Sequence, residues 1–374
     1  MSSGIPYISV IMPVYNSARY LRETMDCIVQ QSLQDIEIIC VDDGSTDNSL
    51  DILNEYKKDD SRIKIISQQN MGAGAARNAG IQIAQGEYFS FLDADDHFEL
   101  DMLETAYNCC AEADADITVF RCDLFDDNNG TTAPCPWGLR MELLPAQIPF
   151  SWRDIPENIF RVFNGWAWDK LFRASFVKEN GILFQNLKTT NDMLFVISAL
   201  VKAERIITID RVLAHQRRNL RSSLSNNREV SWGCFYEALQ ALRDEILRMG
   251  IFAEVERGFV NFALQHSLWQ LNTITGPAYE LLYNRLKEEW FSRLGIGNRS
   301  VEYFFNPGWY RQYELIMRYD ADTFRKMQQP KHAVAGILPS GKRCVLRAFL
   351  HHIRYLGLRA TMHLIWKKMK QSAS

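Results

Sequence analysis

Residues 87–96 read Glu-Tyr-Phe-Ser-Phe-Leu-Asp-Ala-Asp-Asp, and this stretch indicates how the first part of the chain folds. A short apolar and aromatic run bounded by Gly86 and an acidic cluster is typical of a buried strand. Carboxylates that end such a strand lie at the rim of an α/β sheet, where ligands bind. Asp93 and Asp95 are close enough to share one hard cation with phosphate oxygens. Because capping a following helix would need only one acid, we favour a metal or nucleotide site.

The chain before this stretch alternates strand and helix signals. Apolar β-rich runs are followed by segments with helical spacing, in the order strand 8–14, helix 18–31, strand 36–41, helix 46–56, strand 63–66 and helix 72–84. Such alternation predicts an α/β fold with a mostly parallel sheet and helices on its faces. Further on we expect a helix at 103–113, a strand at 117–120 and a polar loop region over 126–156.

Length and composition fit a folded protein with more than one unit. A chain of 374 residues can hold a full α/β domain and a smaller second unit. The eight cysteines are scattered without a C-x-x-C pair, which fits a reducing compartment better than a disulfide scaffold or a zinc site. The N-terminus lacks signal-peptide features, and no run approaches the roughly 18 apolar residues of a membrane span. We therefore expect a cytoplasmic protein.

The end of the chain differs from the rest in charge. Eleven Lys and Arg residues and no acid follow Asp322, although the whole chain has a net charge of -3. We predict a domain at 1–225, a helical region at 226–325 and a basic amphipathic tail at 326–374. The tail fits a contact with an anionic membrane surface, on the inner face of the cell membrane, or a final helix packed on the rest of the protein.

Three further motifs precede the acidic cluster in a fixed order, at 10–16, 41–47 and 72–80. Over roughly residues 5–225 the set resembles the inverting glycosyltransferases of family 2, of the bacterial polysaccharide-biosynthesis type. The resemblance implies a GT-A fold, which is Rossmann-like, followed here by a helical C-terminal region. It implies transfer of a sugar from a nucleotide sugar, a UDP-sugar, to a hydroxyl of a glycan or lipid-linked oligosaccharide. It also implies Mn²⁺ or Mg²⁺ as the cofactor and no nucleic-acid partner.

The first two motifs contain candidates for binding the donor's base. Pro13 and Tyr15 lie at the end of the first predicted strand, where a ring and backbone can pack on a base. Asp42 ends the second strand, and the resemblance makes it the acceptor for a uracil N–H. For Asp43 and Ser45 we favour turn formation and helix capping.

The third motif and the acidic cluster contain the candidates for the diphosphate. Arg77 follows three small residues in its helix, so its guanidinium could reach a base carbonyl or a phosphate; a structural salt bridge is the alternative. The resemblance assigns Asp93-Ala94-Asp95 to the D-x-D element, with Asp93 near the ribose and metal and Asp95 on the metal. The metal would stabilise the departing diphosphate. For Asp96, capping of the next helix and contact with the acceptor stay open.

Inversion also requires a base that takes the proton of the acceptor hydroxyl. Residues 189–195 resemble the family's ED-x-x-F region, which makes Asp192 the candidate base. Asn191 stands where the family often has Glu, so the role falls on Asp192 alone. The alternative is that Asp192 caps a helix starting at Met193.

Two later segments supply candidates for the acceptor or phosphate. Residues 168–173 resemble the family's N-K-L-[FY]-R element, in which Lys170 could steady a sugar hydroxyl or phosphate and Trp168 could stack on a sugar. Asp169 replaces the usual Asn, and for Trp166 we favour core packing. Residues 215–225 resemble a basic, Ser-bearing loop that closes over the diphosphate. Its candidates are Arg217 and Ser223, with His215 as an additional metal ligand.

Two other functions fit parts of the pattern. A non-catalytic nucleotide- or sugar-binding module on the same fold would be expected to lack Asp95 or Asp192, and both are present. A sugar nucleotidyltransferase would need a Gly-rich, Lys-bearing loop after the first strand, and residues 15–19 do not form one. We therefore predict a glycosyltransferase.

Overall fold

The computed structural model describes residues 4–127, 129–218 and 228–328. The chain divides into two compact units, Met1–Phe259 and Val260–Ser374. The predicted boundary at 225/226 and the part of the predicted tail beyond residue 328 lie outside the described residues. Within the described ranges, no helix combines the length and hydropathy that a membrane crossing requires.

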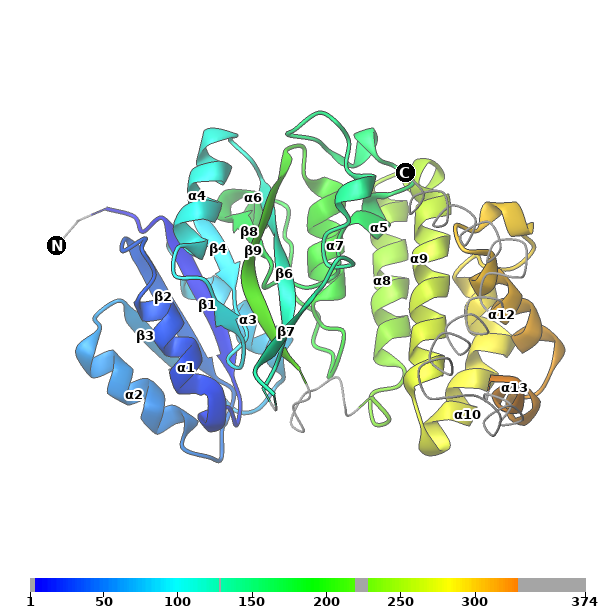
Figure 1. Cartoon of the computed structure of the whole chain (residues 1–374), viewed down its shortest axis with the longest axis horizontal. Helices are drawn as coiled ribbons and strands as arrows, with labels where there is room; N and C mark the ends of the chain where they lie inside the picture. The colour runs from blue at the N-terminus through cyan, green and yellow to red at the C-terminus, as the bar shows by residue number, and fades with distance from the viewer. Residues whose placement is uncertain (1–3, 128, 219–227, 329–374) are drawn as a thin grey trace, which may run out of the picture. The chain divides into compact units, whose positions relative to one another are not determined.

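Strands and helices alternate through the first unit (Figure 1). The strands are β1 (Ile8–Val14), β2 (Ile36–Asp42), β3 (Ile63–Ser67), β4 (Tyr88–Phe91), β5 (His97–Phe98), β6 (Ile117–Asp126), β7 (Thr131–Pro134), β8 (Lys170–Arg173) and β9 (Ile206–Arg218). The α-helices that begin in this unit are α1 (Ala18–Val29), α2 (Ser49–Asp59), α3 (Ala73–Ile83), α4 (Met102–Glu112), α5 (Ile159–Val162), α6 (Ala174–Glu179), α7 (Met193–Lys202), α8 (Cys234–Arg248) and α9 (Phe252–Thr273).

The strands form one sheet in the order β3-β2-β1-β4-β8-β6-β9-β5, with β7 paired to β6. The four strands β1 to β4 are mutually parallel, β6 and β9 are parallel, and β8 runs antiparallel between β4 and β6. Helix α3 packs on β1 and β2, while α4 packs on β6 and β9. This sheet confirms the predicted α/β class with flanking helices.

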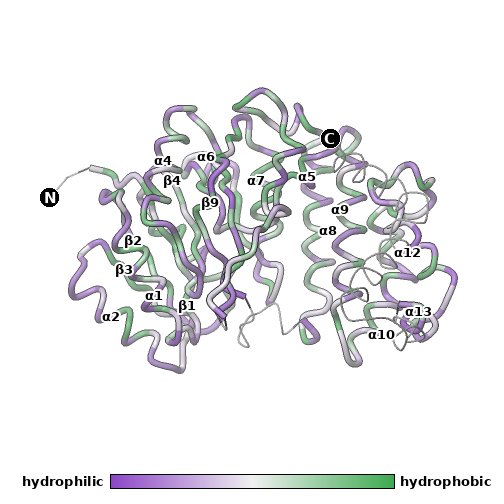
Figure 2. Tube along the Cα trace, viewed as in Figure 1, coloured by the Kyte–Doolittle hydropathy of each residue, from purple (hydrophilic) through white to green (hydrophobic). Residues whose placement is uncertain are grey.

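The parallel half of the sheet is apolar along its strands because helices cover both faces. Every residue of β2 is buried, and so is every residue of β1 except Pro13. Figure 2 shows hydrophobic colour along the strands and alternating colours along the covering helices. The carboxyl ends of β1, β2 and β4 consequently meet at one edge, because these strands point the same way.

Two glycines allow α3 to lie close to its neighbours. A Cβ at Gly80 would lie 2.4 Å from Ile11 Cγ2, so an alanine there would push α3 away from β1. A Cβ at Gly74 would lie 2.1 Å from the carbonyl oxygen of Gln185. The absence of a side chain at residue 74 therefore brings the first turn of α3 against the segment that leads to Asp192.

The later strands differ from the predicted elements. The predicted strand at 117–120 continues to Asp126 as β6, and the strand that begins at Ile206 continues to Arg218 as β9. β7 lies within the region predicted to be a loop, while β5 and β8 were not predicted as strands. The consequence for the site is that His215 and Arg217 lie on a strand rather than on a loop.

The second unit confirms the predicted helical C-terminal region. Its elements are α10 (Gly276–Arg285), the short π-helical η4 (Leu286–Trp290), α11 (Phe291–Arg293), the 3-10 turn η5 (Val301–Tyr303), α12 (Pro307–Arg318) and α13 (Ala321–Gln328). The buried Tyr283 hydroxyl lies 3.0 Å from the carbonyl oxygens of Ile316 and Tyr319, which fixes α10 against the end of α12.

Candidate active site

The predicted base-binding residues lie at the carboxyl ends of the first two strands. Tyr15 follows β1 and is 48% exposed, whereas Asp42 ends β2 and is 3% exposed. Pro13 is half-buried beside Val41 in the parallel register. Asp42 Oδ1 accepts a hydrogen bond from the Ser45 N–H over 3.2 Å. The ring of Tyr15, just after β1, and the carboxylate of Asp42, at the end of β2, thus lie at the same edge of the sheet.

The loops after β1 and β2 are joined by hydrogen bonds. Asn16 has a φ of 48°, a left-handed conformation that Asn tolerates better than most residues. Its Oδ1 accepts from the Thr46 N–H over 2.7 Å, and its own N–H donates to Ser45 Oγ over 3.1 Å. Asp43 accepts from the N–H groups of Met71 and Gly72 over 2.9 and 2.8 Å. Asp43 therefore fixes the loop before α3, a contact that differs from the turn and capping roles that we favoured.

Arg77 is the centre of a second group at this edge, which we call the Arg77 cluster: Arg77, Asp93, Asn191 and Asp192. Its Nη2 lies 2.6 Å from Asp93 Oδ1, and its Nη1 donates to Asn191 Oδ1 over 2.9 Å. The guanidinium lies over the Phe184 ring, 5.2 Å from its centroid. Its Nε–H is buried without a hydrogen-bond partner in the structure. The cluster thus keeps one unsatisfied cationic donor.

Asp192 precedes α7 in the N-cap position, but its side chain makes no capping hydrogen bond. Burial raises the pKa of its carboxyl to about 6; the Arg77 charge opposes this shift and the Asp93 charge adds to it. Thr190 has a φ of 60°, which is strained for a β-branched residue. The carboxylate of Asp192 is therefore near Arg77 and Asp93 and is not used by its own helix.

Asp95 and Asp96 differ in how their carboxylates are used. Burial, with the Asp93 charge, raises the pKa of Asp95 to about 6. Burial likewise raises the pKa of Asp96 well above its usual range. Asp96 Oδ1 accepts the Arg217 N–H over 2.7 Å, and its carbonyl accepts from Thr24 Oγ1 over 2.8 Å. Asp96 does not cap α4, because this helix starts only at Met102. Its contact with the acceptor stays a prediction.

The carboxylates of Asp93 and Asp95 supply oxygen atoms, which a hard cation prefers as ligands. In the described part of the chain, no other residue donates a hydrogen bond to the Asp95 carboxylate, and Ala94 beside it is buried. Asp93 shares one oxygen with Arg77. The same part contains no group of three His, Cys, Asp or Glu residues that could hold a metal by itself. Asp93 and Asp95 therefore present carboxylate oxygens of the kind that a hard cation binds.

Arg217 is placed differently from the predicted phosphate contact. Its side chain is 1% exposed, and its Nη atoms pair with Glu23 over 2.7 Å and with Asp127. Both ring nitrogens of His215 are also engaged, with Asp123 at 2.6 Å and Glu99 at 3.0 Å. These contacts correct the phosphate role of Arg217 and the metal role of His215, because protein groups already use their polar atoms. Ser223 lies outside the described residues.

The acceptor candidates on and before β8 are buried. Lys170 Nζ donates to Asp169 Oδ1 over 2.5 Å and to the carbonyls of Asn164 and Trp166 over 3.1 and 2.8 Å. An ammonium has three donors, so none is left for a sugar or phosphate. Trp168 is 3% exposed and stacks on the more exposed Trp166. The predicted contacts of Lys170 and Trp168 with substrate are therefore corrected, and Trp166 is the ring with access to solvent.

Several residues of the site had no signal in the sequence. Phe184 packs on Arg77 from a segment without periodic apolar residues, and Glu23 and Asp127 reach Arg217 from elements far away along the chain. Small residues before Arg77 did indicate a close approach, and Gly74 provides it. Long-range partners of this kind become visible only when the register of β6 and β9 is known.

Comparison with known proteins identifies the family. The model of "Glycosyl transferase family 2" matches residues 9–166. A cholesterol galactosyltransferase of Borreliella burgdorferi is 31% identical over 303 residues, which cover 77% of this chain and 82% of that protein. The chain belongs to glycosyltransferase family 2. The predicted family and the predicted enzyme class are thereby confirmed.

Other relatives match over a smaller share of their length. A poly(ribitol-phosphate) beta-glucosyltransferase of Bacillus spizizenii is 37% identical over 208 residues, 53% of this chain and 30% of that protein. This family 2 chain also spans 62% of the Bacillus subtilis glycosyltransferase EpsH. Among solved structures, S. aureus TarS residues 1–349 in complex with UDP-GlcNAc has a TM-score of 0.65 at 21% identity, covering 88% of this chain and 94% of that one. This likeness confirms the GT-A fold.

Proposed function

We propose that this family 2 glycosyltransferase transfers a sugar with inversion from a UDP-sugar to a hydroxyl of a glycan or lipid-linked oligosaccharide. We assign the reaction to the synthesis of a cell-surface polysaccharide. The observation that carries the proposal is the position of Asp192, whose uncapped carboxylate stands with Arg77 and Asp93. A carboxylate that its own helix does not use is available to a substrate.

Asp192 is the proposed base. With a pKa of about 6, its carboxylate is ionised at neutral pH and is more basic than an ordinary Asp. It accepts the proton of the acceptor hydroxyl as that oxygen bonds to the anomeric carbon. The bond from this carbon to the diphosphate oxygen breaks on the opposite face, and its electron pair leaves with the nucleoside diphosphate. An α-linked donor gives a β-linked product through an oxocarbenium-like state.

The donor is held at the edge where β1, β2 and β4 end. Tyr15 and Pro13 pack on the base, and Asp42 accepts the uracil N–H. Asp95, with Asp93, holds Mn²⁺ or Mg²⁺, which when bound supplies charge stabilisation to the departing diphosphate. Arg77 pairs with Asp93 at the same edge, and its guanidinium is our candidate for a contact with the same diphosphate. TarS, which shares the fold, is known in complex with UDP-GlcNAc, and this supports a UDP-sugar.

A donor screen tests this proposal. The release of nucleoside diphosphate is measured for UDP- and GDP-sugars with and without Mn²⁺, and we expect metal-dependent release with one or more UDP-sugars. Asp192→Asn should retain donor binding and lose about 100- to 10,000-fold in transfer, as expected when a general base is removed. Asp101→Asn is the matched control, because Asp101 also precedes a helix without capping it. Substantial transfer by Asp192→Asn would contradict the base assignment.

The basic tail supports a peripheral place on the inner face of the membrane. Eleven Lys and Arg residues follow Asp322, and a lipid-linked acceptor would lie at that surface. Removal of residues 342–374 should weaken sedimentation with vesicles that contain anionic lipid. Unchanged sedimentation would leave the tail without this role.

A further inference from the structure

We propose that Arg217 is a positioning residue that fixes the backbone of Asp95, so that the Asp95 carboxylate is presented to a divalent cation. This inference rests on the proposed metal site at Asp95. It gives Arg217 a role different from the phosphate contact expected from the sequence. The role is indirect, because Arg217 touches the peptide group of Asp95.

The contacts of Arg217 define what we call the Arg217 network: Arg217, Glu23, Asp96, His97 and Asp127. The Arg217 N–H donates to Asp96 Oδ1 over 2.7 Å, and its Nε–H donates to the Asp95 carbonyl over 2.8 Å. Nη2 pairs with Glu23 over 2.7 Å and contacts His97, while Nη1 pairs with Asp127. Arg217 thus holds two successive residues of the acidic turn and is itself held by three others.

The guanidinium is fixed on its faces as well as at its edges. It lies 4.5 Å from the centroid of the Tyr20 ring and 5.4 Å from that of Phe125. A buried cation is tolerated only where it is paired and hydrogen-bonded, and Glu23 and Asp127 supply the opposite charges. The guanidinium therefore has one orientation, and the Asp95 carbonyl is bound in that orientation.

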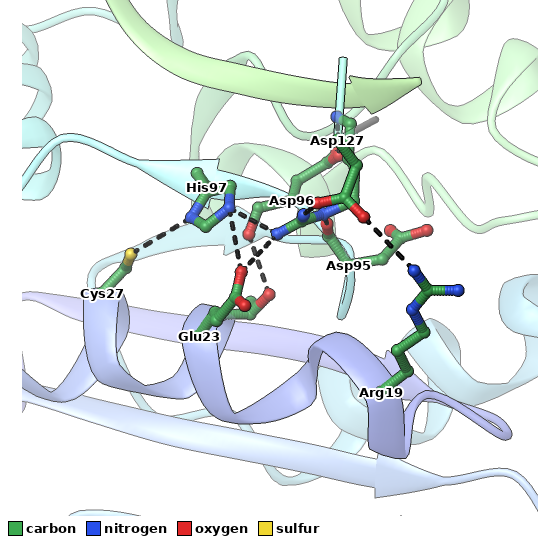
Figure 3. A network of polar contacts seen from close by, with 9 residues as sticks. Arg19, Glu23, Cys27, Asp95, Asp96, His97 and Asp127 are labelled. Carbon is green, nitrogen blue, oxygen red and sulfur yellow. Dashed lines mark hydrogen bonds and ion pairs between the residues drawn. The ribbon is translucent and has the colours of Figure 1, made fainter. Parts of the chain in front are cut away.

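The network joins parts of the chain that are far apart in sequence. Figure 3 shows Glu23 on α1, His97 on β5 and Asp127 just after β6 gathered beside Asp96. In the same view the Asp95 carboxylate points away from His97 and Glu23. Arg217 holds this residue through its carbonyl oxygen, so both carboxylate oxygens stay available to a ligand.

Lysine cannot reproduce this arrangement. Its ammonium is a point charge, while the planar fork of arginine reaches the Asp95 carbonyl with Nε and the acidic partners with its Nη atoms. Arg217→Lys keeps the charge and loses the geometry. Partners that orient a metal ligand typically alter metal affinity by about 10- to 100-fold when they are changed. We expect a change of this size in cation affinity, with little change in the metal-free affinity for nucleotide.

The test measures Mn²⁺ binding by the whole 374-residue chain with UDP present, using electron paramagnetic resonance of free Mn²⁺. Arg217→Lys should raise the Mn²⁺ dissociation constant about 10-fold or more, and excess Mn²⁺ should restore its transfer rate. The matched control is Arg62→Lys, because Arg62 is also largely buried and donates to Asp60, Gln34 and the Val29 carbonyl. Both variants are expected to lower the melting temperature, and only Arg217→Lys should alter Mn²⁺ binding.

Other outcomes separate this inference from the proposed function. If the wild type binds no Mn²⁺ with UDP, or Asp95→Asn binds it equally well, the metal site is wrong and the inference falls with it. If wild type and Asp95→Asn differ as expected but Arg217→Lys binds Mn²⁺ like wild type, only the inference is overturned. Should Arg217→Lys fail to fold, Glu23→Gln removes the negative charge of one partner and retains Arg217. This variant should weaken Mn²⁺ binding by about 2- to 5-fold, and an unchanged constant would overturn the role.

Discussion

Two arginines lie beside the same acidic turn and are used in opposite ways. Arg77 has two protein partners and a buried Nε–H without one, whereas Arg217 has protein partners for its Nε and both Nη atoms. An incompletely satisfied cation can bind a ligand, while a satisfied one can only hold structure. Lys170 is of the second kind, since its three donors are used by Asp169 and by the carbonyls of Asn164 and Trp166. Hydrogen-bond satisfaction, more than residue type, separates binding residues from positioning residues here.

The largest expected effect is a loss of folding stability when a buried cation whose hydrogen bonds are all made is removed. Lys170→Met leaves Asp169 buried without its cation, so we expect the free energy of unfolding to fall by about 3–5 kcal/mol in urea denaturation. Lys64→Met is the control, because the Lys64 side chain is 43% exposed and its pair with Glu37 should contribute no more than about 1 kcal/mol. A stable Lys170→Met with a higher KM for the donor would show that Lys170 contacts the substrate after all.

The next effect compares the two arginines directly. Arg77→Lys should lower kcat/KM by about 10- to 100-fold, the size of one or two lost hydrogen bonds to a charged group. Because the proposed lost contact is with the donor, excess Mn²⁺ should not restore the rate, in contrast to Arg217→Lys. Titration of the transfer rate with Mn²⁺ for both variants distinguishes them. Full recovery of Arg77→Lys at high Mn²⁺ would remove the distinction between the two residues.

A third prediction concerns stability at Asp192. Its carboxyl has a pKa of about 6 in the folded chain, above that of an unfolded Asp, so the wild type loses stability as the pH rises from about 4 to about 6 and the loss is complete above that value. Asp192→Asn should therefore be more stable than wild type by about 1–2 kcal/mol near neutral pH, after allowance for partial solvent access. The difference should vanish below about pH 3, where both folded and unfolded wild type are protonated at this residue. Urea denaturation at both pH values measures it; a less stable variant at neutral pH would refute the burial of this charge.

The smallest expected effect is a shift in the pH dependence of kcat/KM, which reports on the charges of the Arg77 cluster. The wild-type kcat/KM should fall below about pH 6 as Asp192 becomes protonated. Arg77, Asp93 and Lys170 are the charged groups that act on Asp192. Asn191→Asp adds a negative charge beside Arg77, so the acidic limb of the pH profile should move to higher pH. Asn191→Ser is the neutral control, and an unchanged limb in Asn191→Asp would mean that another group sets the profile.

The parallel half of the fold could be predicted from the sequence because its strands are buried on both faces. The run at 8–14 matches β1, and 36–41 misses only the last residue of β2. The end of β9 could not be predicted, since Arg211, His215 and Arg217 give it a polar sequence. Their side chains are paired with acids from other elements, so a polar strand is stable there.

The candidate site could be predicted from the sequence for those residues whose position follows from lying at the carboxyl end of a strand. Asp42, Asp93 and Asp95 are of this kind. It was not predictable where the role depends on which groups surround the side chain. Trp166 and Trp168 are two residues apart, and the sequence does not indicate which ring faces the core. Lys170 is satisfied by two backbone carbonyls, which no side-chain pattern reveals.

The left-handed backbone of Thr190 has a consequence for how α7 begins. A helix start and a base compete for one carboxylate, since the free N–H groups of the first turn are strong donors and Asp is a favoured cap. Had Asp192 capped α7, the bond would have lowered its basicity. The chain instead enters the helix through a conformation that costs about 1–2 kcal/mol for such a residue. The N–H groups in the first turn of α7 therefore receive no hydrogen bond from the Asp192 carboxylate. The start of the helix is less stable as a result, and the carboxylate keeps its basicity.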